Sequence, residues 1–348
     1  MANAKHNKKR FKGIITILIL IVLVATSVVM IEKEPKVPSS GQVNQPVINQ
    51  NGEPLGELLM TMIDVGQADS FLFEQNGKVA VVDCGTRSTG KNVVSYLKSK
   101  GITRIDYLIG THPHEDHMGG MYAVLTSFDI GTVIIPKVTK SEITTNWYTK
   151  LMGELSSGKY DVKYSEVGQE YNLGQAKMKT IGPITEPDDE NLNNYSIVMK
   201  VSFGDMDVIM TGDAEEQVEK EILQSGVDLD AEMLKVGHHG SQTSTSDAFL
   251  DAIDPDYALI SAKVGNKYDH PMPTTMAKLK ARNIEVYRTD EQGNVVITIT
   301  AKEITFNCTP GDYQSGTQLA ESSKKGGWLI WKASLPLTAS RAISLSLK

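Results

Sequence analysis

The sequence has 348 residues, of which 40% are hydrophobic, 22% charged and 6% aromatic. This composition is that of one large globular domain or two modest ones, and it excludes a disordered or collagen-like chain. Residues 1–31 hold five basic residues and no acidic one, so removing +5 from the net charge of −7 leaves −12 for the remainder. That sign repels phosphate backbones and disfavours a broad, non-specific nucleic-acid binder. The two cysteines, Cys84 and Cys308, match neither a disulfide framework nor a metal-binding pair.

The first predicted element is a membrane-spanning helix over residues 14–31. These residues carry no charge, and as a helix they reach roughly 27 Å, close to the ~30 Å hydrocarbon core of a bilayer. The alternative is a cleaved signal followed by secretion, but the apolar run is long for a signal and no Ala-x-Ala site follows it. We therefore read residues 1–31 as a basic flank and uncleaved anchor. Because basic flanks stay in the cytoplasm, the rest of the chain is expected outside the cell.

Residues 32–56 are predicted to be a flexible linker, since they contain four prolines among polar residues and show no apolar periodicity. Residues 57–307 are predicted to form one domain. Its first strands are expected at 58–65 and 70–85, with a tight turn at Asn76-Gly77.

Later strands of this domain each follow a segment with helical spacing or belong to a hairpin. They are expected at 105–112, 133–136, 257–261, 284–288 and, as a hairpin turning at Gly204-Asp205, at 194–213. Paired strands mixed with strand-helix units favour an α/β sandwich of two sheets flanked by helices. Residues 308–348 show no clear apolar periodicity and are predicted to be a tail of unknown role, poorly ordered or loosely docked.

The main chemical signal is a cluster of histidines after the strand at 105–112. His112 and His114 are two apart on extended backbone, so both can face one metal ion. Asp116 and His117, at the turn into a helix, can hold a second ion. Imidazole nitrogen and carboxylate oxygen suit zinc, manganese or iron. Helix-capping histidines are the plain alternative, but three histidines and an aspartate in six residues make it a poor account.

Two further stretches extend this cluster. Asp213 follows an apolar strand and precedes a helix, where an aspartate is usually an N-cap, and Glu216 completes a capping-box-like pattern. Beside a two-metal site, Asp213 is instead the natural bridging carboxylate. His238 and His239 lie among small residues that let a substrate or metal approach the backbone closely. His270 offers one more imidazole.

The order HxHxDH, a later aspartate after a strand and a final histidine resembles the metallo-β-lactamase superfamily. The resemblance is closer to the C-terminal hydrolase domain of the ComEC competence proteins and covers roughly residues 58–300. The motifs that carry it occur in order at 63–70, 82–85, 193–196, 211–214, 238–241 and 270–271. It implies an αββα sandwich, the metallo-β-lactamase fold, with two divalent metal ions, zinc or manganese.

The resemblance also implies roles for individual residues. The implied metal ligands are His112, His114, Asp116, His117, Asp213 and His270. The residues expected to support these ligands without binding metal are Asp64, Asp83, Asn193 and Asn194, with Asp83 orienting the metal-binding loop. Catalysis is assigned to Asp116, His238 and His239.

Three departures from the family pattern bear on these roles. Asn193 and Asn194 stand where the superfamily usually has another metal-binding histidine, and either His238 or His239 is a candidate to replace it. His114 stands where ComEC relatives often have aspartate, and Ala68 where they usually have glycine. ComEC proteins have many membrane spans and this sequence predicts one, so the DNA-channel role does not transfer.

The leading hypothesis is a membrane-anchored, outward-facing, dinuclear metal-dependent hydrolase. We expect a phosphodiesterase or nuclease linked to DNA uptake or to envelope phosphodiesters. The ComEC resemblance favours DNA as the substrate, whereas the charge of −12 favours a small or wall-linked ester. Two alternatives stay open: a non-catalytic accessory component that binds a DNA-uptake channel, and a hydrolase of lactams or thioesters, because fold does not fix substrate.

Overall fold

The computed structural model describes residues 55–138, 143, 145–187 and 191–325. The predicted anchor, nearly all of the predicted linker and residues 326–348 lie outside the described residues. Within the described ranges there is no helix with the length and hydrophobicity of a membrane span.

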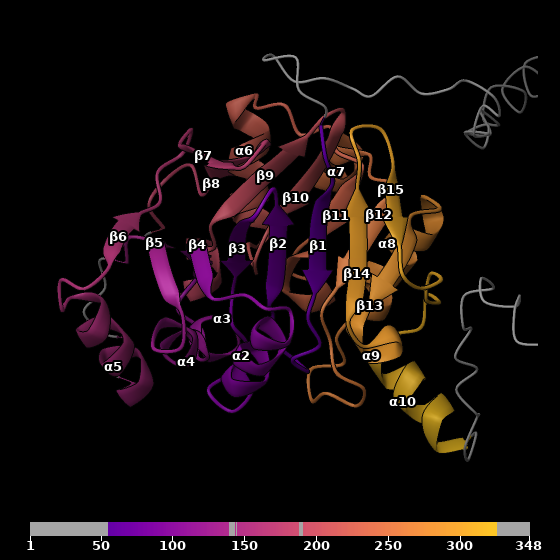
Figure 1. The fold of residues 1–348 in the computed structure, drawn as a ribbon. Coiled ribbons are helices and arrows are strands. Elements are labelled where there is room, and N and C mark those ends of the chain that lie inside the picture. Colours follow the sequence, from indigo (N-terminus) through magenta and orange to yellow (C-terminus); the bar gives the residue numbers. More distant parts are fainter. Residues whose placement is uncertain (1–54, 139–142, 144, 188–190, 326–348) are drawn as a thin grey trace, which may run out of the picture. The chain divides into compact units, whose positions relative to one another are not determined.

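Two mixed sheets form the centre of the fold (Figure 1). The first has eight strands, in the spatial order β15 (Ile304–Phe306), β14 (Val295–Ile299), β1 (Leu58–Met62), β2 (Phe71–Gln75), β3 (Lys78–Val82), β4 (Arg104–Ile109), β5 (Asp129–Ile135) and β6 (Asp161–Tyr164). The second has seven, in the order β13 (Glu285–Arg288), β12 (Tyr257–Ile260), β11 (Met233–Lys235), β10 (Met206–Met210), β9 (Val198–Phe203), β8 (Ala176–Gly182) and β7 (Glu170–Leu173).

The two predicted hairpin turns are confirmed. Asn76 and Gly77, between β2 and β3, have φ of 49° and 73°, the left-handed values that this tight turn requires. Gly204, between β9 and β10, has φ of 63°. The strands that these turns join, β2 with β3 and β9 with β10, are mostly buried on both faces, because one face meets the other sheet and the opposite face meets helices.

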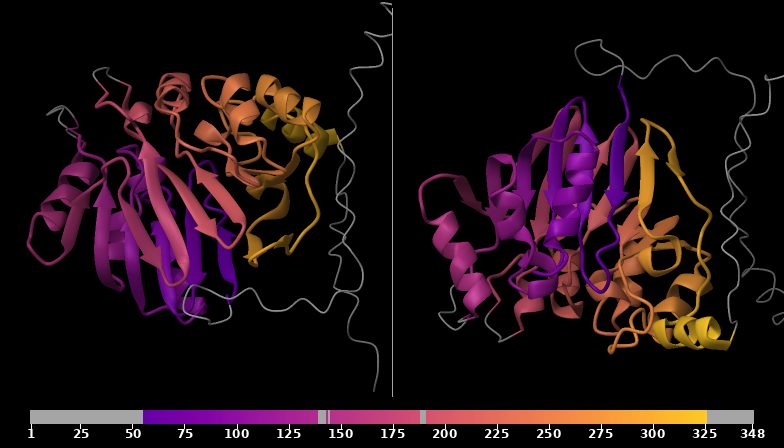
Figure 2. Two further views of the ribbon diagram at one scale, coloured as in Figure 1. Left: turned by 90° about the horizontal axis from the view of Figure 1, so that it is seen from above. Right: turned by 60° about the horizontal axis from the view of Figure 1, so that its bottom comes forward.

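Helices cover the outer face of each sheet, so the chain forms an αββα sandwich as predicted (Figure 2). Those on the first sheet are α2 (Gly90–Ser99), α4 (Met121–Leu125) and α5 (Asn146–Leu155). Those on the second sheet are α6 (Glu216–Ser225), α7 (Asp247–Ile253) and α8 (Pro273–Ala281). Between the sheets lies a third apolar cluster that includes Phe73 and Phe203, both fully buried. Each such side chain contributes about 1.5–3 kcal/mol of hydrophobic free energy as an upper estimate.

Short helices lie where strands end, and they carry or flank the residues of interest. They are α3 (Glu115–Met118), the 3-10 turns Leu192–Tyr195 and Gly237–Gly240, and α9 (Thr289–Gln292). The alternative that Asp213 serves as an N-cap is excluded, because the N-cap of α6 is Glu215. Asp213 is therefore free to turn its carboxylate inward.

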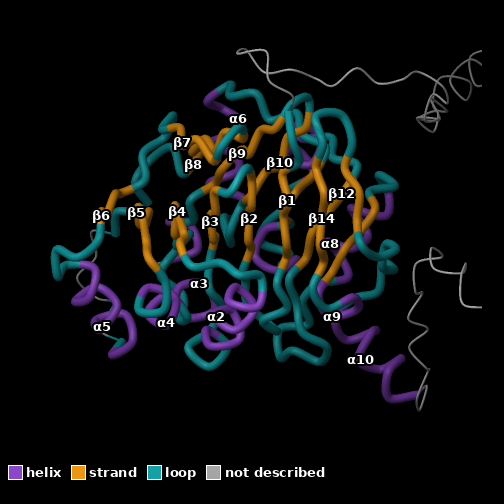
Figure 3. Tube along the Cα trace, viewed as in Figure 1, coloured by secondary structure: helices purple, strands orange, loops and turns teal. Residues whose placement is uncertain are grey.

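Residues 308–325 continue the described fold beyond the boundary predicted at residue 307. They end in α10 (Gly316–Lys325), the helix at the lower right of Figure 3. The Gly316 amide donates to the Pro271 carbonyl at 3.1 Å, and a Cβ at Gly316 would collide with the His270 carbonyl. The fully buried guanidinium of Arg288 donates to the Gln314 carbonyl and pairs with Asp290. The first residue of α10 thus contacts and fixes the loop that carries His270.

Candidate metal centre

The predicted site residues gather at one edge of the sandwich. In each sheet the central strands run parallel, β3 with β4 and β10 with β11 and β12. Parallel strands place their carboxyl ends at the same edge, which is where such folds bind ligands. The segments that follow β4, β10 and β11 carry His112, Asp213 and His239, and all three side chains are buried.

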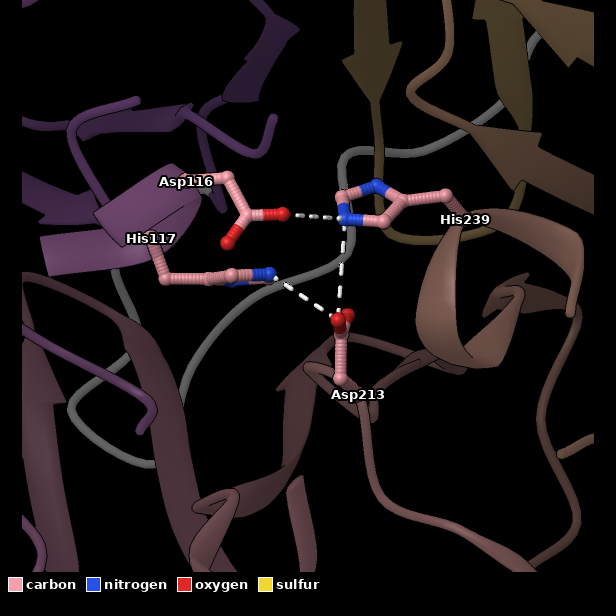
Figure 4. A group of neighbouring side chains, drawn as sticks. All are labelled: Asp116, His117, Asp213 and His239. Carbon is pink, nitrogen blue, oxygen red and sulfur yellow. Dashed lines mark hydrogen bonds and ion pairs between the residues drawn. The ribbon is translucent and has the colours of Figure 1, made fainter. Parts of the chain in front are cut away.

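Four of these side chains point toward one another (Figure 4). One ligand atom each from Asp116, His117, Asp213 and His239 lies within 4.8 Å of the others. His117 Nε2 is 3.2 Å from Asp213 Oδ2, and His239 Nε2 is 3.3 Å from Asp116 Oδ2 and 3.6 Å from Asp213 Oδ2. The carboxylate of Asp213 is therefore shared between groups from both sheets.

The remaining predicted site residues lie around the same cluster. His112 Nε2 lies 3.9 Å from Asp213 Oδ2 and 3.0 Å from His114 Nδ1. His238 Nε2 lies 3.7 Å from Asp213 Oδ2. The His270 ring is 5.3 Å from the His238 ring, at the wall of a cavity of about 230 Å³ that opens over the cluster. The structure thus brings the six predicted ligands and the two histidines predicted to be catalytic to one edge of the fold, with Asp213 in contact with four of the imidazoles.

The histidine pair adopts an uncommon backbone. His238 and His239 have φ of 50° and 53°, in the left-handed region that few non-glycine residues occupy. Such conformations cost free energy and concentrate at functional sites. Their effect here is to send the two rings apart: His239 is buried among the ligands, whereas 24% of the His238 side chain is exposed at the cavity and its Nδ1 faces Glu215 at 3.4 Å.

Asp83 fixes the ring of His117. Its Oδ2 lies 2.7 Å from His117 Nδ1, while its oxygens accept hydrogen bonds from the Thr111 amide at 2.8 Å and hydroxyl at 2.7 Å. A carboxylate on one ring nitrogen directs the other nitrogen toward a metal. This is the geometry that the supporting role predicted for Asp83 requires.

Of the other three predicted supporting residues, Asn193 and Asn194 contact the segment after Asp213, whereas Asp64 does not. Asn193 Nδ2 donates to Glu215 Oε1 at 3.0 Å, and Asn194 Oδ1 accepts from the Glu215 amide at 3.3 Å, so both hold the segment after Asp213. Asp64 is exposed and its Oδ1 accepts from the Gly66 amide at 3.0 Å. The structure therefore does not place Asp64 beside the ligands, because it stabilises a turn at the surface.

Two residues that the sequence did not single out lie directly behind the cluster. Lys235 is fully buried, and its Nζ is 2.9 Å from Asp69 Oδ2. The same ammonium donates to the carbonyls of Gly212 at 3.0 Å and Val236 at 2.9 Å. Asp69 Oδ1 in turn lies 3.3 Å from His239 Nδ1. The sequence did contain one signal for this pair, because Lys235 lies inside an apolar strand. Lysine is almost never fully buried unless it is paired, so its position indicates a buried acidic partner.

Burial and charge set the protonation of the cluster. Burial lowers the pKa of His112, His114 and His270, the last to about 4, so these imidazoles are neutral at pH 7. Burial alone would raise the pKa of Asp213, but His117 and His239 outweigh it and hold that pKa well below its usual value. Neutral imidazoles and ionised carboxylates are the forms that bind metal.

The two innermost histidines have the opposite shift. Burial would lower the pKa of His117, yet Asp213 and Asp83 raise it well above its ordinary value. In the same way Asp213 and Asp69 overcome burial and raise the pKa of His239 to about 10. Both histidines therefore carry protons when no metal is bound.

The residues present fit divalent cations. Asp213 Oδ1 is buried and has no hydrogen-bond partner among the described residues, and the buried His117 Nε2 faces the Asp213 carboxylate at 3.2 Å. Buried polar atoms without partners are rare unless water or an ion satisfies them. The histidine and aspartate donor set suits zinc or manganese.

Binding of zinc at pH 7 should release protons from His117 and His239. A cation requires the unprotonated imidazole nitrogen, so protons and metal compete. Because the pKa of His117 is raised well above its ordinary value and that of His239 to about 10, apparent zinc affinity should rise as pH increases. Calorimetry in buffers of different ionisation enthalpy would count the protons. Metal binding with no proton release would contradict these charge states.

Comparison with known proteins decides the family. A model described as the metallo-beta-lactamase superfamily matches residues 63–262. The chain belongs to the metallo-β-lactamase superfamily. ComE operon protein 3 of Bacillus subtilis (strain 168) is 31% identical over 283 residues, which are 76% of this chain and 35% of the relative. Competence protein ComA of Neisseria gonorrhoeae is 29% identical and covers 69% of this chain and 32% of the relative.

These relatives confirm the ComEC-like resemblance. Recombination protein 2 of Haemophilus influenzae, also 29% identical, covers 67% of this metallo-β-lactamase superfamily chain and 28% of its own length. The chain therefore spans about a third of the length of these curated relatives. Among solved structures, the metallo-beta-lactamase fold protein YhfI of Bacillus subtilis has a TM-score of 0.45 at 14% identity, covering 70% of this chain and 100% of that one.

Proposed function

We propose that this superfamily hydrolase is a metal-dependent phosphodiesterase, anchored in the membrane by residues 14–31 with its folded domain outside the cell. The observation that carries the catalytic part is the convergence of four imidazole nitrogens, from His112, His117, His238 and His239, on Asp213 Oδ2, beside an open cavity of about 230 Å³. An open position over a histidine and carboxylate cluster is what hydrolytic metal sites provide and structural sites lack.

The chemistry divides between the cations and the protein. Two divalent cations, when bound, supply Lewis acidity that lowers the pKa of a water molecule and stabilises charge on a phosphoryl oxygen. The residues that would hold them are His112, His114, Asp116, His117, Asp213 and His239. His239 takes the place first predicted for His270, because it lies in the cluster with Asp116, His117 and Asp213 whereas His270 lines the cavity. His238 is placed to deliver a proton to the leaving oxygen, since it is partly exposed at the cavity and Glu215 Oε1 lies 3.4 Å from its Nδ1.

The names of the relatives support phosphodiesters over lactams or thioesters. They are called competence and recombination proteins, names that associate them with DNA. Because this chain covers about a third of their length, their transport role is not proposed for it.

His114→Ala should lose metal and activity together. The variant removes one imidazole from the cluster, so we expect a fall in kcat/KM of roughly 10²-fold or more. The assay uses the full chain in detergent with manganese or zinc, on linear DNA and on a small chromogenic phosphodiester. Lys302→Gln, an exposed residue in the turn between β14 and β15, is the matched control. Wild-type turnover by His114→Ala would refute the assignment, and turnover of neither substrate by the wild type would refute phosphodiester hydrolysis.

A second candidate is an accessory protein without turnover. Its specific support is that Asn193 and Asn194 occupy the place of a usual metal-binding histidine and hydrogen-bond Glu215 instead. Pull-down of membrane partners separates the two functions. Partner binding that survives every ligand substitution, in a chain without hydrolytic activity, would favour the accessory role.

A further inference from the structure

A second hollow adjoins the metal cavity. It has a volume of about 500 Å³ and shares four lining residues with the metal cavity, namely Gln67, Glu115, Asp116 and Tyr268. The two therefore form one continuous groove that starts at the metal ligands. The lining of the second hollow has no histidine and adds two ammonium groups, those of Lys263 and Lys267, beyond the carboxylates of Glu115 and Asp116 that it shares with the metal cavity.

The far part of the groove is formed by the loop 263–270, between β12 and α8, and this loop has a fixed internal scaffold. Asn266 Nδ2 donates to the carbonyls of Lys263 at 2.9 Å and His270 at 2.6 Å. Its Oδ1 accepts from the amides of Tyr268 and His270, each at 3.1 Å. The side chain of Asn266 thus fixes the backbone of His270, which lines the metal cavity, and that of the exposed Tyr268.

The start of α10 also contacts this loop and fixes it. Asp269 Oδ1 accepts from the Thr317 amide at the start of α10, and the Gly316 amide binds the carbonyl of Pro271. These contacts come from a segment far from the loop in sequence. Preorganisation of this kind lowers the entropic cost of binding a ligand.

Tyr268 is an exposed aromatic side chain at the centre of the groove. Its relative exposure is 52%, one of four large hydrophobic residues in the described chain that stand out in this way. Its ring stacks on the His270 ring at 5.5 Å with an interplanar angle of 26°, and Lys267 Nζ lies 4.7 Å from its centroid. Aromatic ring and cation therefore form one platform beside the metal cluster.

The two lysines of the loop are available for a ligand. Lys263 and Lys267 are exposed, and neither has a carboxylate partner among the residues that the structure describes. Other lysines, such as Lys78 and Lys159, are paired with carboxylates at 3.1 Å and 3.0 Å. Unpaired cations flanking an exposed aromatic ring are the combination that binds a single nucleic-acid strand, through phosphates and a stacked base.

We propose that the loop 263–270 is a nucleotide subsite of the metal centre, in which Tyr268 stacks on an unpaired base and Lys263 and Lys267 bind the flanking phosphates. The inference rests on the proposed function and narrows its substrate class to single-stranded nucleic acid. A duplex keeps its bases stacked on one another and presents no free face to Tyr268. The local cations also explain how a domain with an overall negative charge attracts a polyanion at this place.

Binding to a fluorescein-labelled twelve-nucleotide oligothymidylate tests the subsite without turnover. Anisotropy is measured on the full chain in detergent with EDTA, over a series of salt concentrations. Tyr268→Ala should weaken binding about tenfold, whereas Tyr268→Phe should bind as the wild type does, because stacking uses the ring. Lys263→Gln and Lys267→Gln should each reduce the slope of log K against log salt by about 0.7.

Matched controls lie away from the groove. Tyr164→Ala removes an aromatic ring of similar exposure, 50%, from the edge strand β6, and Lys302→Gln removes an exposed cation at the opposite end of the strands. Neither should change affinity or salt slope. The basic residues before residue 13 are common to all variants, so only differences between variants are scored.

The outcomes separate this inference from the proposed function. Hydrolysis of the small chromogenic diester by the wild type, with Tyr268→Ala binding the oligonucleotide as Tyr164→Ala does, overturns the subsite and leaves the hydrolase standing. Loss of binding in the loop variants, without hydrolysis of any ester, supports the subsite and refutes hydrolysis. Equal affinity of wild type for a fully paired duplex, or no binding of the single strand, also overturns the subsite.

Discussion

Asp213→Asn should remove most of the bound metal and lower kcat/KM by roughly 10³-fold, more than the 10- to 100-fold expected for a residue that only supports a ligand. Asp213 Oδ2 lies 3.2–3.9 Å from four imidazole nitrogens contributed by both sheets. Asparagine keeps the volume of the side chain and removes its charge, so the loss measures what the shared negative charge provides between two cations.

Metal content by mass spectrometry and kcat/KM on the small phosphodiester are the two measurements. Asp64→Asn is the matched control, because Asp64 is an exposed aspartate near the same edge of the fold that binds the Gly66 amide and no cluster residue. It should keep metal and activity. Full metal occupancy in Asp213→Asn would contradict a bridging role, and metal loss in Asp64→Asn would restore the supporting role first predicted for it.

Lys235→Met should lower the free energy of unfolding by about 3–5 kcal/mol, the usual cost of breaking a buried ion pair on one side. The change leaves the Asp69 carboxylate buried without its cation and deprives the carbonyls of Gly212 and Val236 of a donor. Lys78→Met, which breaks an exposed pair with Asp106, should cost at most about 1 kcal/mol.

Urea unfolding at pH 7 gives these values, and a double-mutant cycle isolates the pair. The double variant Lys235→Met with Asp69→Asn should be less destabilised than the sum of the single variants. Burial would raise the pKa of Asp69, but Lys235 and His239 hold it below its usual value. The contribution of the pair is therefore present at neutral pH and is lost only as pH falls below about 4 toward the folded-state pKa. Additive effects would exclude the coupling.

The positions of the histidines could be predicted because each follows a strand, and parallel strands end at a common edge. Asp64 and Asp69 show where that argument stops. Both follow β1 within one short motif, yet Asp64 is exposed while Asp69 is buried against Lys235. The chain reverses at Gly66, with φ of 78°, and the Asp69 amide donates to the carbonyl of Asp116. Which acid turns inward depends on this loop geometry and not on spacing.

The burial of Lys235 and the presence of α10 could not be predicted from local sequence patterns, for a related reason. Lys235 is explained by Asp69, which lies far away in the sequence and belongs to the other half of the sandwich. Helix α10 is fixed partly by main-chain contacts, such as that from Gly316 to Pro271, which leave no side-chain signature. Both depend on tertiary neighbours that periodicity does not report.

The cluster of predicted metal ligands also combines residues from both sheets. His112, His114, Asp116 and His117 follow a strand of the eight-stranded sheet, whereas Asp213, His238 and His239 follow strands of the seven-stranded sheet. Apolar packing between the sheets is non-directional, but a cation held by both halves would act as a cross-link, worth about 2.7 kcal/mol when the free ion is at 100 times its Kd. Metal supply would then govern two properties at once: how fast the protein turns over substrate, and how long it resists unfolding and proteolysis.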